Sequence, residues 1–522
     1  MKKIIFSAFM LVSLVACTGN FVTENENPYT LSEQMLTQDN NLLGSPFSSI
    51  LSNLSGFQVD DNLLNDCFAR QMATGTPFAS GINNTTYYPT WNTFWSERAY
   101  TVMSATKKVI ENAKKYNLPM FADWAKLARV LVMSKATAIY GPLIYSKYGT
   151  QGSTVLYDKE SDLYNTFFAQ LDTIQADFKA NSAYTGFKKF DASYNGDIPS
   201  WMRLVNSLRL RLAIRLAKVA PALAKTQGEK ALADAAGLIT DNKYNFTTSL
   251  NGSKLPLATI CFDWDDTRMD AAMESFLVGL NDGRIAKYFQ PAADNTLYSD
   301  HPSYPYKGIR NGAYLDSKGQ HINFSKINAS FSSVTYRKHF TAAETYFLMA
   351  EAALRGWAGA GDAKTDYETG VKLSFSDWGA GGVDAYLADA TSTPINYIDP
   401  KDSRNSFTTR STVTVAWNNA DPIELKLEKI ITQKWINTFT NSLEAWVDMR
   451  RTGYPKLPFN AKNDSNDTWG TIGATDFIKR MPFVDSERTS NAAGVADAIT
   501  KLGGPDKIST RLWWDTGAAS NF

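Results

Sequence analysis

Residues suited to acid–base or metal chemistry are few in this 522-residue chain. Its three histidines are His301, His321 and His339. No nucleotide-binding glycine loop, Gly-x-Ser-x-Gly elbow or His-Glu-x-x-His helix is found in the sequence. Because general acid–base catalysis and transition-metal sites depend strongly on histidine, both are disfavoured, while carboxylate chemistry stays open.

Carboxylates are plentiful, and one cluster of them is dense. A glycoside hydrolase needs only two carboxylates that face each other across a sugar, so with 52 acidic residues a hydrolase remains the alternative function. The cluster at 263–266, Asp-Trp-Asp-Asp, has part of the spacing of a calcium-binding EF-hand loop. Position six of that loop, however, would be Arg268 in place of glycine. We therefore interpret the cluster as a solvated acidic turn and predict no metal or cofactor, with a structural calcium left open.

Tyrosines in polar segments are better candidates for a binding site. Tyr87 and Tyr88 lie in one segment punctuated by Gly and Pro, and Tyr298, Tyr304 and Tyr306 lie in another. Aromatic rings stack on the C–H faces of sugars, and the Asn, Asp and Arg side chains nearby can bind the hydroxyls. We predict that these five tyrosines contribute to a ligand-binding site. The alternative is that they pin long loops to the scaffold, since tyrosine has an apolar body and a polar tip.

The elements that must position these residues are mainly helices. Four segments place apolar residues on one helical face, and they are 124–132, 201–216, 341–355 and 431–446. Thr341 and Glu344 have capping-box spacing, and Gly356 marks the end of that helix. Helices joined in pairs by short turns predict a mainly α fold of TPR-like stacked helix pairs, without a repeat clean enough to count.

Four long connections interrupt the helical pattern. Rich in Gly, Asn, Ser, Pro and aromatic residues, they are 75–89, 290–330, 379–420 and 454–475. Connections of this length are unusual in compact domains and tend to carry function. We expect one mainly α domain with long irregular ligand-binding loops inserted into it.

The charge balance argues against a polyanionic partner. Lys and Arg total 53 against 52 Asp and Glu, a net charge of +1, so no overall field would draw the protein to nucleic acid. Four arginines do crowd one predicted helix, at 203, 209, 211 and 215. We expect them to pair with carboxylates of a neighbouring helix rather than with phosphate.

The N-terminus has the pattern of a lipoprotein signal. Two lysines precede a mostly apolar run, and Leu-Val-Ala-Cys ends it at Cys17. We predict a signal peptide at 1–16, lipidation of Cys17 and a flexible tether at 17–30, followed by the helical domain at 31–522. The acyl chains would anchor the protein. Outside the cytoplasm Cys67 and Cys261 could be oxidised, but the sequence leaves open whether they form a disulfide.

Several segments together resemble the SusD/RagB family. The stretch AETYFLMAEAALRG around Ala350–Gly356 is similar to the central helix of that family, and the stretch from Glu428 to Pro455 resembles its most recognisable segment. The segments Phe57–Ala73, Ala136–Gly149 and Leu502–Asp515 fit as well. The matches run in family order from about residue 20 to the C-terminus, with the lipobox in its expected place.

This resemblance implies a non-catalytic outer-membrane lipoprotein of Bacteroidetes-type bacteria. Proteins of the family sit on the cell surface as a lid over a SusC-like TonB-dependent transporter and capture oligosaccharides, or in some members peptides, for import. Their ligand sites lie in the long inserted loops. The residues Trp435, Trp446 and the pair Arg450-Arg451 match positions that we interpret as scaffold.

Overall fold

The computed structural model describes residues 37–152 and 154–522, so the predicted signal peptide, Cys17 and the tether lie outside the described residues. The described chain is mainly helical. Its α-helices are α4 (Asn41–Gly44), α5 (Pro46–Ser52), α6 (Phe78–Gly81), α7 (Tyr100–Lys115), α8 (Pro119–Tyr140), α9 (Glu160–Ala180), α10 (Ile198–Arg215), α11 (Pro221–Ala233), α12 (Pro256–Ala258), α13 (Ala271–Gly279), α14 (Ile285–Tyr288), α15 (Ala342–Leu354), α16 (Ala363–Trp378), α17 (Val383–Ala388), α18 (Ile423–Asn437), α19 (Ser442–Thr452), α20 (Asp485–Ser490) and α21 (Ala492–Leu502). None of these helices is long and apolar enough to cross a membrane.

Short 3-10 and π-helical turns lie between them. They are η1 (Gln38–Asn40), η2 (Gln58–Asp66), η3 (Asn84–Thr86), η4 (Trp95–Ala99), η5 (Lys188–Phe190), η6 (Asn242–Tyr244), η7 (Thr259–Asp263), η8 (Asn295–Tyr298), η9 (Lys318–His321), η10 (Ala329–Ser333) and η11 (Ser403–Asn405). Two antiparallel two-stranded sheets complete the described fold, β1 (Met72–Thr74) with β3 (Thr267–Met269) and β2 (Phe246–Ser249) with β4 (Tyr336–Phe340).

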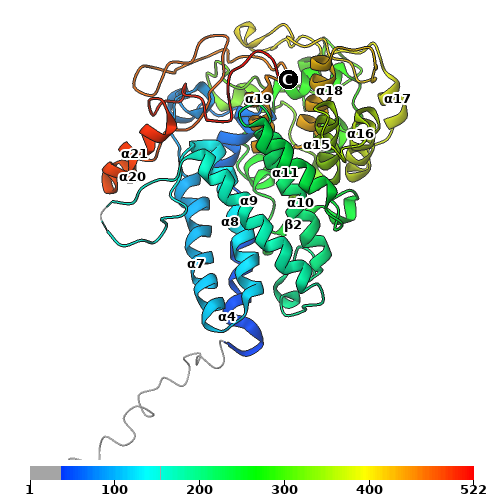
Figure 1. Cartoon of the computed structure of the whole chain (residues 1–522). Helices are drawn as coiled ribbons and strands as arrows, with labels where there is room; N and C mark the ends of the chain where they lie inside the picture. The colour runs from blue at the N-terminus through cyan, green and yellow to red at the C-terminus, as the bar shows by residue number, and fades with distance from the viewer. Residues whose placement is uncertain (1–36, 153) are drawn as a thin grey trace, which may run out of the picture.

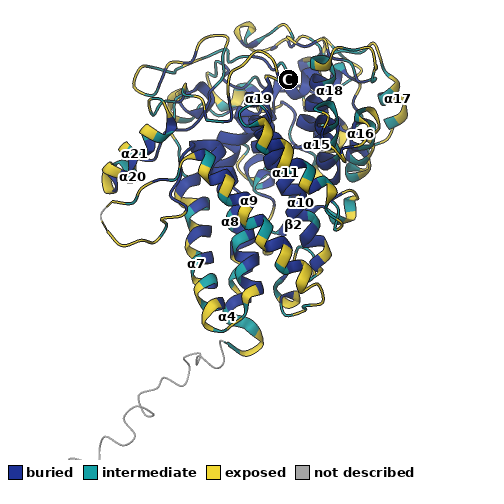
Figure 2. Ribbon diagram, viewed as in Figure 1, coloured by how far each residue is buried: buried dark blue, intermediate teal, exposed yellow. Residues whose placement is uncertain are grey.

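Consecutive helices pack as pairs, which confirms the predicted mainly α, TPR-like architecture. The pairs α7–α8, α10–α11, α15–α16 and α18–α19 are each joined by a short connection, and α9 packs against both α8 and α10. Figure 1 shows α7 and α8 extending from α4 at one end of the molecule, while the connections 379–420 and 454–475 cross the opposite end. The helices α15, α18 and α19 are buried along most of their length (Figure 2).

The start of α15 shows a capping box that is only half formed. The Thr341 hydroxyl accepts the Glu344 backbone N–H at 3.2 Å, as the spacing predicts. The Glu344 carboxylate does not return to the cap; it accepts two hydrogen bonds from Arg211, at 2.8 and 2.7 Å. A buried guanidinium thus replaces the backbone as the partner of that carboxylate.

The prediction of one continuous helix across 431–446 is wrong. The chain forms α18 and α19, separated at 438–441, where Thr440 has a φ of +73°. Contacts from the β4 segment hold this turn: Arg337 donates to the Thr440 carbonyl at 3.0 Å, and Asn441 donates to the His339 carbonyl at 3.0 Å. Apolar periodicity alone does not reveal a turn that tertiary hydrogen bonds stabilise.

Buried ion pairs connect the central helices, as the crowding of arginines in α10 predicts. Three of its four arginines pair with carboxylates from other helices, in the pairs Arg209–Asp172, Arg211–Glu344 and Arg215–Glu444. The fourth, Arg203, lies 4.2 Å above the ring of Tyr244. Asp172 is 40% exposed, but both partners of the Arg211 and Arg215 pairs are buried. Buried charged groups must be paired to be tolerated, so these two pairs fix how α10, α15 and α19 meet.

The residues interpreted as scaffold are buried. Trp435 and Trp446 are almost fully enclosed, Arg450 stacks on Trp446 at 3.5 Å, and Arg451 donates to Glu351 at 2.6 and 2.8 Å. The segments that carry the family resemblance therefore supply the core and its charged network.

The two cysteines of the described chain are free thiols. Cys67 and Cys261 are both buried, and burial raises the pKa of Cys261 to about 11. Neither forms a disulfide.

Candidate functional site

The long connections predicted to carry function meet on one side of the molecule. We call this surface the loop face and define it by residues 75–89, 290–330, 379–420 and 454–475. The first connection is joined to the fourth by the Asp464 backbone N–H, which donates to the Thr86 carbonyl at 2.7 Å. The second is joined to the third by the Tyr314 backbone N–H, which donates to the Asn405 side chain at 2.8 Å.

Arg310 fastens three of these connections together. Its guanidinium donates to the Phe459 carbonyl at 2.9 and 2.6 Å and to the Ser406 carbonyl at 2.9 Å. Burial and the nearby Arg70 lower the pKa of Arg310 to about 10. The loops are therefore built into a defined surface by internal hydrogen bonds.

Two of the five predicted ligand tyrosines are buried, and for them the loop-anchor alternative holds. Tyr87 is 1% exposed and its hydroxyl accepts a hydrogen bond from Arg70 at 2.7 Å. Tyr306 is 7% exposed. Burial raises the pKa of both phenols. Rings enclosed in this way offer no face to a ligand, so these two positions correct the prediction.

The other three tyrosines, Tyr88, Tyr298 and Tyr304, are half-buried and remain candidates. Tyr298 and Tyr304 flank a compact turn in which the His301 N–H donates to the Tyr298 carbonyl at 3.0 Å and the Tyr304 N–H donates to the His301 carbonyl at 2.9 Å. The Tyr304 hydroxyl donates to Asn281 at 2.7 Å, which fixes the orientation of its ring.

Trp264 is an exposed aromatic residue that is not among the five predicted ligand tyrosines. Its indole is 42% exposed and meets the ring of Phe57 edge-on at 5.0 Å. Lys318, in the second connection, donates to the Trp264 carbonyl at 2.6 Å, and Thr76, in the first, donates to Asp266 at 2.8 Å. Trp264 thus lies at the border of the loop face. The sequence feature that could have indicated this position is a tryptophan between aspartates in a predicted turn.

The aspartates around Trp264 each face a cation of the protein. The pairs are Asp263–Lys254 at 2.9 Å, Asp265–Lys326 at 2.7 Å and Asp266–Lys318 at 2.9 Å. These lysines supply the positive charge that a calcium ion would otherwise provide.

Phe78 and Trp91 are two further aromatic residues near Tyr88. Their rings meet edge to face at 5.8 Å, and both are half-buried. The i, i+4 spacing of Trp91 and Trp95 predicts core positions, which is correct for the buried Trp95 and wrong for Trp91.

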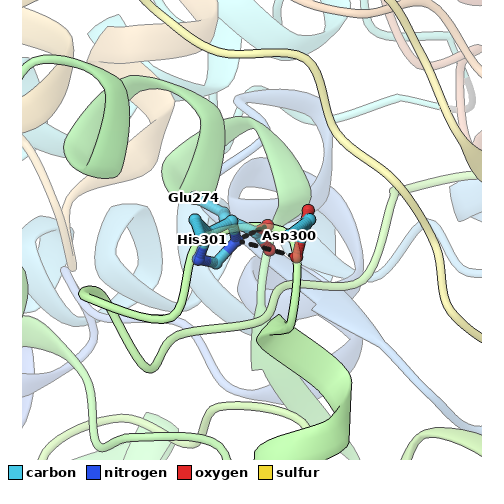
Figure 3. A group of neighbouring side chains, drawn as sticks. All are labelled: Glu274, Asp300 and His301. Atoms are coloured by element: carbon cyan, nitrogen blue, oxygen red, sulfur yellow. Dashed lines mark hydrogen bonds and ion pairs between the residues drawn. The ribbon is translucent and has the colours of Figure 1, made fainter.

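One group of potential metal ligands brings Glu274 of α13 together with Asp300 and His301, two residues of the Tyr298–Tyr304 turn (Figure 3). The Lys307 ammonium lies 2.8 Å from Glu274, 3.2 Å from both oxygens of Asp300 and 3.4 Å from His301 Nε2. The Lys307 ammonium therefore lies among the three side chains and supplies the positive charge that a metal ion would otherwise provide. We interpret the group as an ion-pair cluster that supports the loop, and not as a metal centre.

Comparison with known proteins places the chain in a family. The family model described as SusD-like, SusD and RagB outer membrane lipoprotein, matches residues 23–515. No curated protein matches the sequence significantly.

Solved structures are similar over nearly the whole chain. A chitin-binding SusD homologue from Flavobacterium johnsoniae is 39% identical, with a TM-score of 0.87, over 92% of this chain and 100% of its own. A SusD homologue from Bacteroides uniformis is 34% identical, with a TM-score of 0.82, over 91% of this chain and 99% of its own. A SusD-like protein from Bacteroides thetaiotaomicron is 29% identical, with a TM-score of 0.83, over 91% and 98%. The chain belongs to the SusD-like family of outer-membrane lipoproteins.

Proposed function

We propose that this protein captures chitin oligosaccharides on its loop face at the cell surface and delivers them to a SusC-like TonB-dependent transporter, without catalysing any reaction on them. The observation that carries the proposal is the 39% identity to a chitin-binding homologue that is matched over its full length. The half-buried rings of Tyr88, Tyr298 and Tyr304, with the exposed indole of Trp264, supply surfaces on which sugar rings can stack.

The affinity expected of such a surface is modest. Sugar hydroxyls are already solvated, so each hydrogen bond to protein nets only about 0.5–1.5 kcal/mol. Burial of ring C–H faces adds about 25 cal/mol per Å². A sum of roughly 4–8 kcal/mol corresponds to dissociation constants between about millimolar and micromolar. That range suits a protein that must pass its ligand on.

Calorimetric titration of the purified protein with chitohexaose, cellohexaose and a hexapeptide tests the ligand class. We expect binding of chitohexaose in the range above and weaker or no binding of the other two. Preferential binding of the peptide would replace the glycan proposal with the family's other ligand class. Release of reducing ends from chitohexaose, abolished by substitution of a single Asp or Glu, would establish the hydrolase alternative instead.

Substituting the accessible aromatic side chains tests whether the loop face binds the ligand. Trp264→Ala and Tyr298→Ala should each weaken chitohexaose binding about tenfold, the loss of roughly 1.4 kcal/mol of stacking and burial, with little change in melting temperature. Tyr346→Ala, which removes a half-buried tyrosine from the scaffold helix α15, is the matched control and should bind normally. Normal binding by both loop variants would show that the ligand lies elsewhere.

Membrane anchoring is proposed to depend on Cys17, after removal of a signal peptide at 1–16 and through a tether at 17–30. Cys17→Ala should therefore move the protein from the membrane fraction to the soluble fraction, because a diacylated cysteine holds far more firmly than any surface contact. Cys261→Ala removes a cysteine of the folded domain and should remain in membranes. Sedimentation of Cys17→Ala with membranes in high salt would contradict the lipid anchor.

The transporter partnership can be tested by co-purification. An affinity tag on this protein should retain a SusC-like transporter from detergent-solubilised outer membranes, with or without chitohexaose. Recovery of the protein alone from crosslinked cells would contradict the partnership.

A further inference from the structure

The hydrogen bonds of His301 define its protonation state. Nδ1 lies 2.8 Å from the Tyr304 carbonyl oxygen, and Nε2 lies 2.8 Å from Glu274 Oε1. A carbonyl oxygen can only accept, so Nδ1 must carry a proton. Glu274 also accepts from the Lys307 ammonium at 2.8 Å and from the Gly308 backbone N–H at 2.6 Å, as an ionised carboxylate does. Nε2 therefore donates as well, and an imidazole that donates from both nitrogens is an imidazolium.

The same ring organises the turn that presents two candidate ligand tyrosines. His301 lies between Tyr298 and Tyr304 in sequence, and its backbone is hydrogen-bonded to both. Through Nε2 the turn is tied to α13, which carries Glu274. The side chain is 10% exposed, so water competes little for these bonds. Loss of one ring proton would leave two electronegative atoms facing each other at one of the two contacts.

We propose that His301 is a protonation-dependent clamp, which holds the Tyr298–Tyr304 turn in its ligand-binding form when it is an imidazolium and releases it when it is neutral. This inference rests on the proposed function insofar as the turn contacts the ligand. The clamp itself is a property of the unliganded protein.

The charges around His301 are balanced only in its protonated form. Glu274 from α13 and Asp300 from the turn supply two negative charges, and Lys307, which follows the turn in the sequence, supplies one positive charge. Tyr397, from the third connection, places its ring 5.1 Å from the Lys307 ammonium. An imidazolium makes the cluster neutral, whereas a neutral imidazole leaves one negative charge in a largely buried site.

The direction of the pH dependence follows from these neighbours. Burial lowers the pKa of His301, but the hydrogen bond and charge of Glu274, with Asp300, outweigh burial and the opposing Lys307, so the pKa is raised above its usual value. The clamp is then complete below about pH 6.5, the ordinary histidine pKa, and is lost as the pH rises through the raised value.

Histidine NMR tests the clamp without any ligand. The full chain has three histidines, so selective ¹⁵N labelling gives few signals, and the His301→Gln spectrum assigns the one that belongs to His301. We expect both ring nitrogens of His301 to have imidazolium shifts at pH 6.5 and to titrate above that pH. A neutral tautomer at pH 6.5 would overturn the proposal, whatever ligand the protein binds.

The dependence of binding on pH tests the consequence. Chitohexaose should bind the native protein about tenfold more weakly at pH 8.5 than at pH 5.5, the effect of losing one charge-assisted hydrogen bond. His301→Gln retains a polar side chain but cannot titrate, so its affinity should be nearly independent of pH. Equal pH dependence in both proteins would overturn the coupling of the clamp to binding. If neither protein binds chitohexaose while the NMR titration is as expected, the clamp stands and the proposed ligand is wrong.

Discussion

Replacing Glu444 with glutamine is expected to lower the free energy of unfolding by about 3–5 kcal/mol, the usual cost of removing one partner from a buried ion pair. Glu444 accepts two hydrogen bonds from Arg215, at 2.9 and 2.8 Å, and both side chains are buried. The substitution preserves volume and leaves the Arg215 charge without compensation. Chemical denaturation of the two proteins measures the difference.

Two controls separate this effect from a general loss of charge. Asp263→Asn removes the carboxylate of an exposed pair with Lys254 and should cost no more than about 1 kcal/mol.

The second control is the pH dependence of the effect. Burial disfavours the charge of Glu444, but Arg215, Arg211 and Lys434 outweigh it and lower its pKa to about 2. Because an unfolded glutamate titrates near 4.3, the stabilising effect is present above about pH 4.3 and disappears toward pH 2. The difference in free energy of unfolding between the native and Glu444→Gln proteins should therefore decrease as the pH falls from about 4.3 toward 2. A difference that stays constant over this interval would contradict the ion-pair explanation.

Replacing Trp435 with alanine should cost about 3–5 kcal/mol of stability. The indole is 1% exposed, packs 5.3 Å from the ring of Phe276, and donates from Nε1 to the Ala69 carbonyl at 2.7 Å. Truncation would leave a cavity between α13 and α18 and an unpaired carbonyl. Thermal denaturation should show a much lower melting temperature.

Trp435→Phe separates the contribution of ring packing from that of the hydrogen bond to Ala69. It retains most of the ring packing but removes the donor to Ala69, so its cost should be smaller, about 1–3 kcal/mol. A normal melting temperature for Trp435→Ala, together with lost chitohexaose binding, would show that Trp435 is a ligand platform and not part of the core.

Much of the scaffold follows from local sequence. The apolar stripe at 124–132 and the capping residue Thr341 identify α8 and α15 because burial on one face and a hydrogen-bonded cap are local properties. The break between α18 and α19 does not follow from local sequence, because its stabilising donors, Arg337 and Asn441, bond across segments distant in sequence.

The long connections can be predicted from the sequence, but the burial of the individual tyrosines within them cannot. Composition identified the four connections that form the loop face, since long polar segments with aromatic residues are rare elsewhere in the chain. Composition could not separate the buried Tyr87 from its half-buried neighbour Tyr88, because the two share one sequence segment and the contact of Tyr87 with Arg70 is a tertiary one. The position of Trp264 beside the loop face is not predictable for the same reason: it depends on the hydrogen bond from Lys318 to the Trp264 carbonyl and on the bond from Thr76 to the neighbouring Asp266.

Hydrogen–deuterium exchange with and without saturating chitohexaose tests most directly whether the loop face is the binding surface. We expect slower exchange in two segments, 260–266 around Trp264 and 298–306 around the Tyr298–Tyr304 turn, while α7 and α9, which lie outside the loop face, remain unchanged. Bound ligand should slow exchange by excluding water and by holding these segments closed. Protection confined to α7 and α9, or no protection of the loop face under conditions where calorimetry shows saturation, would contradict the assignment.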